Sequence, residues 1–80
     1  MVCRGTIIGA DAIKISILNR DKGVQEDYWL YGLSEDEIRD FEGLEIFYGV
    51  LPSGELEGFS PAAEAHPTVL QAYEESGCLQ

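Results

Sequence analysis

Residues 12–31 read AIKISILNRDKGVQEDYWLY, and this stretch decides the fold. Isoleucine recurs at every second position from Ile13 to Ile17, and this period of two predicts a strand over residues 12–19 with the isoleucines facing the interior. The NRDKG segment that follows supplies a hairpin loop, because Gly23 can adopt the positive φ that such loops require. The chain is therefore expected to turn back on itself here.

The last part of the quoted stretch, QEDYWLY, is expected to return as the third strand. Successive side chains of a strand point to opposite faces, so Asp27, Trp29 and Tyr31 should share one face. Tyr28 and Leu30 should share the other face. If Tyr28 points into the interior, two large aromatic side chains are left on the outside.

A helix is expected after this hairpin, in the segment SEDEIRDFEG that begins at Ser34. Ser34 and Glu37 have the spacing of a capping box, in which each residue's side chain bonds a backbone amide of the other at the helix start. Ile38 and Phe41, three residues apart, form its apolar stripe. Gly43 can adopt the left-handed conformation that ends a helix.

Three further strands and a second helix complete the predicted order. The strands are expected over residues 2–8, 44–51 and 55–59, and the helix over residues 67–75. The order β-β-β-α-β-β-α predicts a mainly β fold. In element order it resembles a small, five-stranded, partly open barrel of the OB type, with an SH3-like barrel as the alternative. A short helix lies between strands three and four, a helix ends the chain, and residues 1–80 are expected to form a single small acidic β-barrel domain.

The charge of the chain points toward a basic partner. The chain has fifteen acidic residues and five basic ones, which gives a net charge of −10. Phosphate recognition needs clustered lysine and arginine, so direct binding of nucleic acid is not expected. The same charge would repel an anionic membrane surface and speed association with a basic protein. The alternative is that the charge only keeps a small protein in solution.

No segment has the length and apolar character of a membrane span or of a signal peptide, so a cytoplasmic protein is expected. Cys3 and Cys78 lie near opposite ends of the chain. They could form a disulfide if the termini meet, whereas a reducing compartment would keep them as thiols.

Residues that could support catalysis or metal binding are sparse. His66 is the single histidine and stands directly before a proline, which is typical of the start of a helix. Neither cysteine has a spacing that suggests a zinc site, and no metal or other cofactor is expected. Glu55 and Glu57 could form a glycosidase-like carboxylate pair, but the solvent-exposed face of a hairpin is the simpler interpretation. The chain is therefore expected not to be an enzyme.

The aromatic residues give the clearest indication of a functional surface. If the fourth strand places Ile46 and Tyr48 inside, Phe47 faces outward, as do other large apolar side chains. These are Trp29, Tyr31, Phe47, Leu51 and Phe59. A C-terminal helix could cover them with Val69, Leu70 and Tyr73. Left uncovered, aromatic side chains with an acidic rim have the composition of a protein interface.

The acidic residues near the first helix divide into two groups. Acids in the first helical turn are favoured by the helix dipole, which explains Glu35, Asp36 and Glu37. That rule does not explain three others, which are therefore the predicted acidic contact residues beside the aromatic surface: Asp40, Glu42 and Glu45.

These features favour a non-catalytic protein-interaction module that binds a basic protein partner through Trp29, Tyr31 and neighbouring acids. One alternative is an acidic nucleic-acid mimic, an inhibitor of the phage or mobile-element type that presents carboxylates where its target expects phosphates. Another is a small ligand-binding protein or enzyme, which would need a concave pocket lined by convergent polar groups. A homodimer that pairs through the edge of the third strand is a further alternative.

Overall fold

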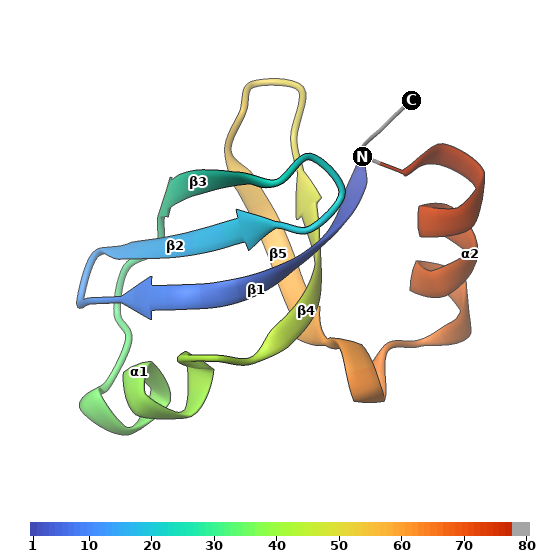
Figure 1. Cartoon of the computed structure of the whole chain (residues 1–80). Helices are drawn as coiled ribbons and strands as arrows, with labels where there is room; N and C mark the ends of the chain where they lie inside the picture. The colour runs from blue at the N-terminus through green and yellow to red at the C-terminus, as the bar shows by residue number, and fades with distance from the viewer. Residues whose placement is uncertain (78–80) are drawn as a thin grey trace.

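The computed structural model of the chain describes residues 1–77 and contains one five-stranded antiparallel sheet (Figure 1). The strand order is β3-β2-β1-β4-β5, so the first strand lies at the centre and β3 and β5 are the two edges. The strands are β1 (Val2–Ala10), β2 (Lys14–Asn19), β3 (Val24–Trp29), β4 (Glu45–Val50) and β5 (Leu56–Pro61). The predicted mainly β, partly open arrangement is confirmed.

Two α-helices and one short 3-10 helix complete the fold. They are α1 (Glu35–Phe41), η1 (Ala62–Glu64) and α2 (Pro67–Ser76). Helix α1 lies between β3 and β4, as predicted, and α2 packs beside β1 on the outer side of the sheet (Figure 1). Among the described residues, no helix combines the length and the apolar character needed to cross a membrane.

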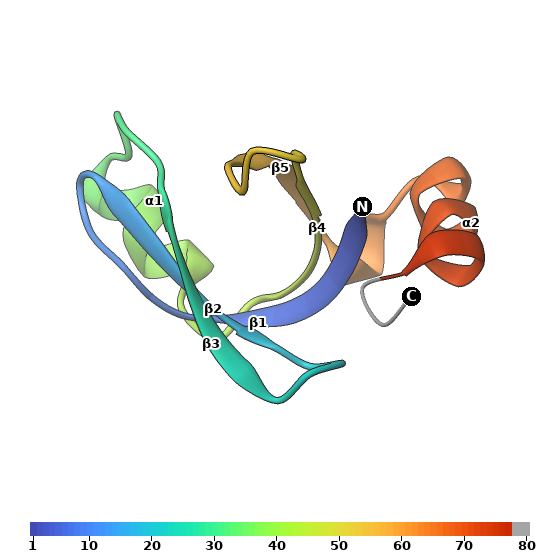
Figure 2. The ribbon, with the colours of Figure 1, turned by 90° about the horizontal axis from the view of Figure 1, so that it is seen from above.

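The sheet curls strongly, so that β3 and β5 face each other without pairing (Figure 2). Two β-bulges contribute to the curl, because a bulge bends its strand and increases its twist. One lies in β1, where the register with β2 shifts between Ile7 and Gly9. The other lies in β5, where Gly49 and Val50 of β4 face Gly58 and Leu56, which leaves Glu57 as the extra residue.

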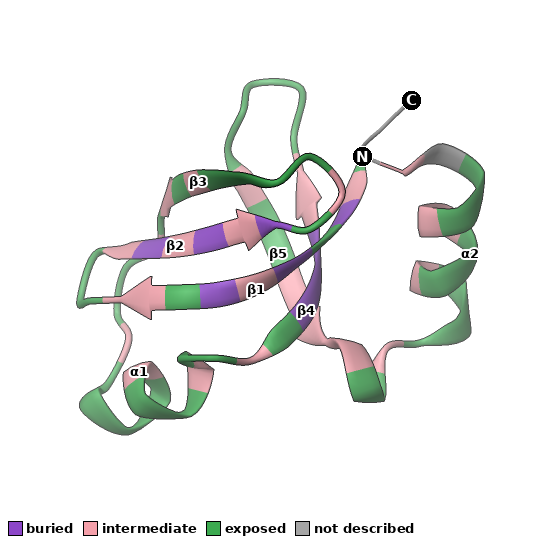
Figure 3. Ribbon diagram, viewed as in Figure 1, coloured by how far each residue is buried: buried purple, intermediate pink, exposed green. Residues whose placement is uncertain are grey.

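The concave face of the sheet carries the core (Figure 3). In the three central strands, every second residue within 3–7, 15–19 and 46–48 is fully or almost fully buried, in keeping with the period of two of a strand. The buried cluster consists of Cys3, Ile7, Ile15, Ile17, Ile46 and Tyr48. Helix α1 closes one end of this core with Phe41, whose ring meets that of Phe59 edge-on at a centroid distance of 5.2 Å. Cys3 is buried, whereas Cys78, considered above as its disulfide partner, lies outside the described residues.

The start and end of α1 follow the sequence signals. The Ser34 hydroxyl accepts a hydrogen bond from the Glu37 amide at 3.2 Å, and the Ser34 amide donates to the Glu37 carboxylate at 3.3 Å. The predicted capping box is therefore confirmed. Gly43 ends the helix with a φ of 81°, and its amide donates to the carbonyl of Ile7 at 2.7 Å. This bond fixes the end of the helix on β1.

Two predicted side-chain orientations were wrong. Ile13 precedes β2 in a bend and has 48% of its surface exposed, so only Ile15 and Ile17 of the three alternating isoleucines lie in the interior. Phe59 was expected to face outward, and in an unbroken strand it would indeed lie on the face opposite to Leu56, three residues earlier. The bulge at Glu57 inserts one residue between them, so that both side chains pack against the core.

The close packing of side chains on the central strands depends on the absence of a side chain at Gly5. A Cβ at this position would lie 2.6 Å from Cγ2 of Ile17, 2.7 Å from the carbonyl oxygen of Leu18 and 3.0 Å from the ring of Tyr48. None of these distances is compatible with ordinary van der Waals contact. Glycine is therefore required because the neighbouring side chains and backbone fill the space.

We expect Gly5→Ala to lower the free energy of unfolding by about 1–3 kcal/mol, the usual cost of overpacking a core. Gly9→Ala is the matched control, because a Cβ on Gly9 has no atom within 4 Å. Its effect should stay within about 0.5 kcal/mol. Urea denaturation followed by circular dichroism measures the free energy of unfolding of both variants. Equal stability of the two would contradict the close approach at Gly5.

Candidate functional site

Trp29 and Tyr31 form an exposed aromatic pair at the end of β3. Their rings are nearly parallel, with an interplanar angle of 6° and a centroid distance of 6.3 Å. The residues expose 65% and 71% of their surface. Helix α2 therefore leaves this pair uncovered. Such large exposed aromatic area is costly in water and is typical of a contact surface.

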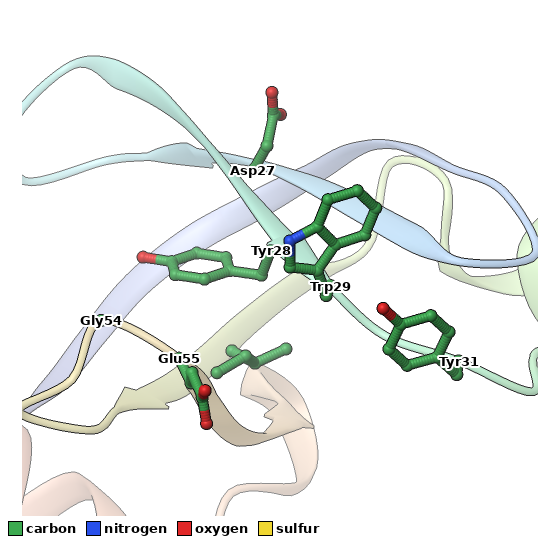
Figure 4. A pocket seen from close by; sticks show the side chains of 7 residues that line it. Asp27, Tyr28, Trp29, Tyr31, Gly54 and Glu55 are labelled. Atoms are coloured by element: carbon green, nitrogen blue, oxygen red, sulfur yellow. The ribbon is translucent and has the colours of Figure 1, made fainter.

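An open cleft of about 480 Å³ lies beside this pair, between the end of β3 and the turn that joins β4 to β5 (Figure 4). Its walls come from two regions that are far apart in sequence but adjacent in the curled sheet. The lining residues are Asp27, Tyr28, Trp29, Tyr31, Gly54, Glu55 and Leu56. The cleft thus combines aromatic rings with two carboxylates. Sequence reasoning missed Glu55 as a neighbour of the aromatic pair, because only the curl of the sheet brings it there.

The carboxylate of Asp27 is held in its charged form. Its oxygen accepts a hydrogen bond from the side-chain amide of Gln25 at 3.1 Å. Hydrogen bonds from Ser16 and Gln25, together with the nearby ammonium of Lys14, lower the pKa of Asp27 below its ordinary value. Lys14 also lines a smaller cleft with Asp27 and Trp29, so one basic side chain stands at the margin of the site.

A second polar group lies on the concave side of β3. One oxygen of Glu26 accepts hydrogen bonds from the hydroxyls of Tyr48 at 2.6 Å and Tyr28 at 2.9 Å. The other oxygen accepts from the side-chain amide of Asn19 at 3.4 Å. Because β4 and β3 are not neighbours in the sheet, the bond from Tyr48 spans the inside of the curl. Sequence reasoning missed this cluster, although strand alternation already puts Glu26 on the face of Tyr28.

Both tyrosine hydroxyls are kept protonated by this environment. Burial raises the pKa of Tyr48 and of Tyr28 far above the ordinary value, and the hydrogen bond to Glu26 acts in the same direction. A raised pKa in the folded state contributes stability below the unfolded pKa of about 10 and loses it as the pH rises above that value.

We therefore expect the free energy of unfolding to fall between pH 10 and pH 11 with a steeper slope in the wild type than in Tyr48→Phe. The difference should approach about 1.4 kcal/mol per pH unit, because the unfolded chain releases a proton that folded Tyr48 retains. Tyr31→Phe is the control, since Tyr31 lies in solvent. Urea denaturation across this range gives the slopes, and equal slopes in the wild type and Tyr48→Phe would contradict the assignment.

Phe47 does not belong to the exposed surface. It faces outward from the sheet, as predicted, but retains only 6% exposure because α2 covers it. Its ring meets that of Tyr73 at a centroid distance of 5.1 Å, and the guanidinium of Arg4 lies over it at 5.8 Å. The hydroxyl of Tyr73 also donates to the carboxylate of Asp21 at 2.6 Å. Cover by the C-terminal helix, one of the two expectations for the outward aromatics, thus holds for Phe47.

The predicted site residues do not form one group. Phe59 lies in the core and Phe47 under α2, so neither joins Trp29 and Tyr31. Glu45 pairs with Arg4 across β4 and β1 at 3.2 Å. Two of the seven predicted residues therefore line the cleft.

The two remaining predicted acids lie near the end of α1. Asp40 and Glu42 are exposed, and neither lines the cleft. A role for them in binding stays a prediction.

Among the described residues, the side chains considered for metal binding or catalysis do not converge. Within residues 1–77, no three histidine, cysteine or carboxylate side chains are grouped so as to hold a metal ion. His66 caps α2, and its Nδ1 accepts a hydrogen bond from the Thr68 amide at 3.1 Å. Glu55 and Glu57 line different clefts, and Glu57 is the extra residue of the bulge in β5.

Comparison with known proteins adds no relative to this description. No protein-family model, no curated protein and no solved structure matches the chain.

Proposed function

We propose that this protein is a non-catalytic interaction module that binds a basic segment of a partner protein in the cleft beside Trp29 and Tyr31. One observation carries the proposal: the parallel, largely exposed aromatic pair lines one open cleft together with the acidic residues Asp27 and Glu55. An arginine or lysine side chain could lie over an aromatic face while its charged group meets a carboxylate. The net charge of −10 favours the approach of such a partner.

Arginine fits this cleft better than lysine for a physical reason. Its planar guanidinium stacks on aromatic rings and pairs with a carboxylate through two donors at once. Lysine offers a compact ammonium that remains strongly hydrated. A nucleic acid would also find rings for its bases, but the carboxylates would repel its phosphates.

A titration with a short peptide in which arginine alternates with threonine tests the proposal. Trp29 is the single tryptophan of the chain, so its fluorescence reports binding at the cleft directly. The double variant Trp29→Ala with Tyr31→Ala should weaken binding by about 30-fold, the effect of losing roughly 2 kcal/mol at a central aromatic contact. Calorimetry measures the affinity of the peptide for the wild type and for the double variant.

Two controls accompany this titration. The double variant Ile8→Ala with Leu70→Ala removes two exposed apolar side chains outside the cleft and should bind as the wild type does. A peptide with glutamate in place of arginine should not bind. Absence of binding by the arginine peptide, or equal affinity of the two double variants, would overturn the proposal.

The alternative of an acidic nucleic-acid mimic stays a prediction, and the same variants distinguish it from the proposed function. A mimic would bind a protein that handles nucleic acid, lose affinity steeply with salt and be displaced by DNA. Its carboxylates, and not the aromatic pair, would carry the affinity. A basic target whose binding survives the loss of Trp29 and Tyr31 would favour the mimic.

A further inference from the structure

The outer edge of β3 has unused backbone groups beside the proposed cleft. The amide of Leu30 donates to the carbonyl of Ile13 at 2.9 Å, which makes these opposite residues a hydrogen-bonded pair. Hydrogen-bonded and non-bonded pairs alternate along an antiparallel ladder. The amides and carbonyls of three residues therefore point away from β2 toward the open edge: Gln25, Asp27 and Trp29.

The opposite edge of the sheet is protected, whereas β3 is not. Strand β5 carries the bulge at Glu57 and ends in Pro61, which has no amide hydrogen to offer. Strand β3 runs for six residues without a bulge or a proline and pairs in unbroken register with β2. Its residues on the outer face are exposed. In the part of the chain that the structure describes, β3 pairs on one side only.

The charge of β3 favours some added strands over others at its free edge. Strand β3 contains Glu26 and Asp27 and no lysine or arginine. Glu26 points inward and is hydrogen-bonded within the molecule, so Asp27 is the carboxylate on the exposed face of this edge. A second copy of the chain paired through the same edge would set one acidic strand against another, and like charges opposite each other destabilise a strand pair. A basic strand would instead bring cations toward Asp27, so the charge of this edge disfavours a homodimer and favours a basic partner.

We infer that the partner segment binds in an extended conformation and adds as a sixth strand along the free edge of β3. This inference rests on the proposed function and specifies its geometry. The free amides and carbonyls of β3 supply main-chain hydrogen bonds, as in other cases of β-strand addition. Asp27 and Trp29 lie on the same face of the strand (Figure 4), so alternate side chains of the partner meet the carboxylate and the ring in turn.

Amide hydrogen exchange, measured by NMR on the wild-type protein, tests this geometry. In the free protein the amides of Gln25, Asp27 and Trp29 should exchange rapidly, and those of Glu26 and Tyr28 slowly. With the alternating arginine–threonine peptide at about nine-tenths saturation, the three edge amides should slow about tenfold, because exchange then requires the free form. The alternation is the signature of an added strand.

A variant checks the same hydrogen bonds from the protein side. Gln25→Pro removes one outward amide at an edge position where proline is tolerated. It should weaken peptide binding about tenfold relative to Gln25→Ala, which keeps the amide and loses the same side chain. Equal affinities would overturn strand addition.

The remaining outcomes separate this inference from the proposed function. If the peptide changes Trp29 fluorescence but the three edge amides keep their free exchange rates, strand addition is overturned and the proposed function stands. If the peptide does not bind at all, both fail. If sedimentation shows a dimer in which these amides are already protected, the edge belongs to a second copy and the inference is wrong.

Discussion

One hydrogen bond crosses the concave side of the curled sheet, from the Tyr48 hydroxyl to the Glu26 carboxylate, and joins β4 to β3. Strands β4 and β3 are separated in the sheet by β1 and β2, so a flat sheet would hold these two side chains far apart. Gly5 makes room for the Tyr48 ring between them. The carboxylate stays on the inner face because three side-chain donors satisfy it, which offsets the cost of removing its charge from water.

Strand β3 therefore has two different tasks on its two faces. Glu26 and Tyr28 point inward and bond each other on the concave side, while Asp27 and Trp29 point outward; the cleft is lined by the two outward residues and by Tyr28. The pleat of the strand separates these tasks by a single residue step. A change on the outer face can thus alter binding without removing any of the bonds that maintain the curl.

Local signals in the sequence predicted most of the fold. The isoleucine alternation predicted β2, the capping box predicted the start of α1, and glycines predicted the turns that end these elements. Each of these effects acts over only a few residues. The failures were non-local. A bulge of one residue at Glu57 turned Phe59 inward. Likewise, Glu55 joins Trp29 only through the curl, and Phe47 is covered only once α2 has docked.

The central place of β1 also determines the order in which this sheet can be completed during synthesis. Strands β1, β2 and β3 are consecutive and can form a meander as soon as they leave the ribosome, whereas the second neighbour of β1 is β4, which follows only after α1. Until β4 arrives, β1 is an exposed edge that carries Cys3, Gly5 and Ile7 on an uncovered apolar face. In any state that precedes the docking of β4, this edge of β1 would be open to mispairing, and the pairing of β4 closes it.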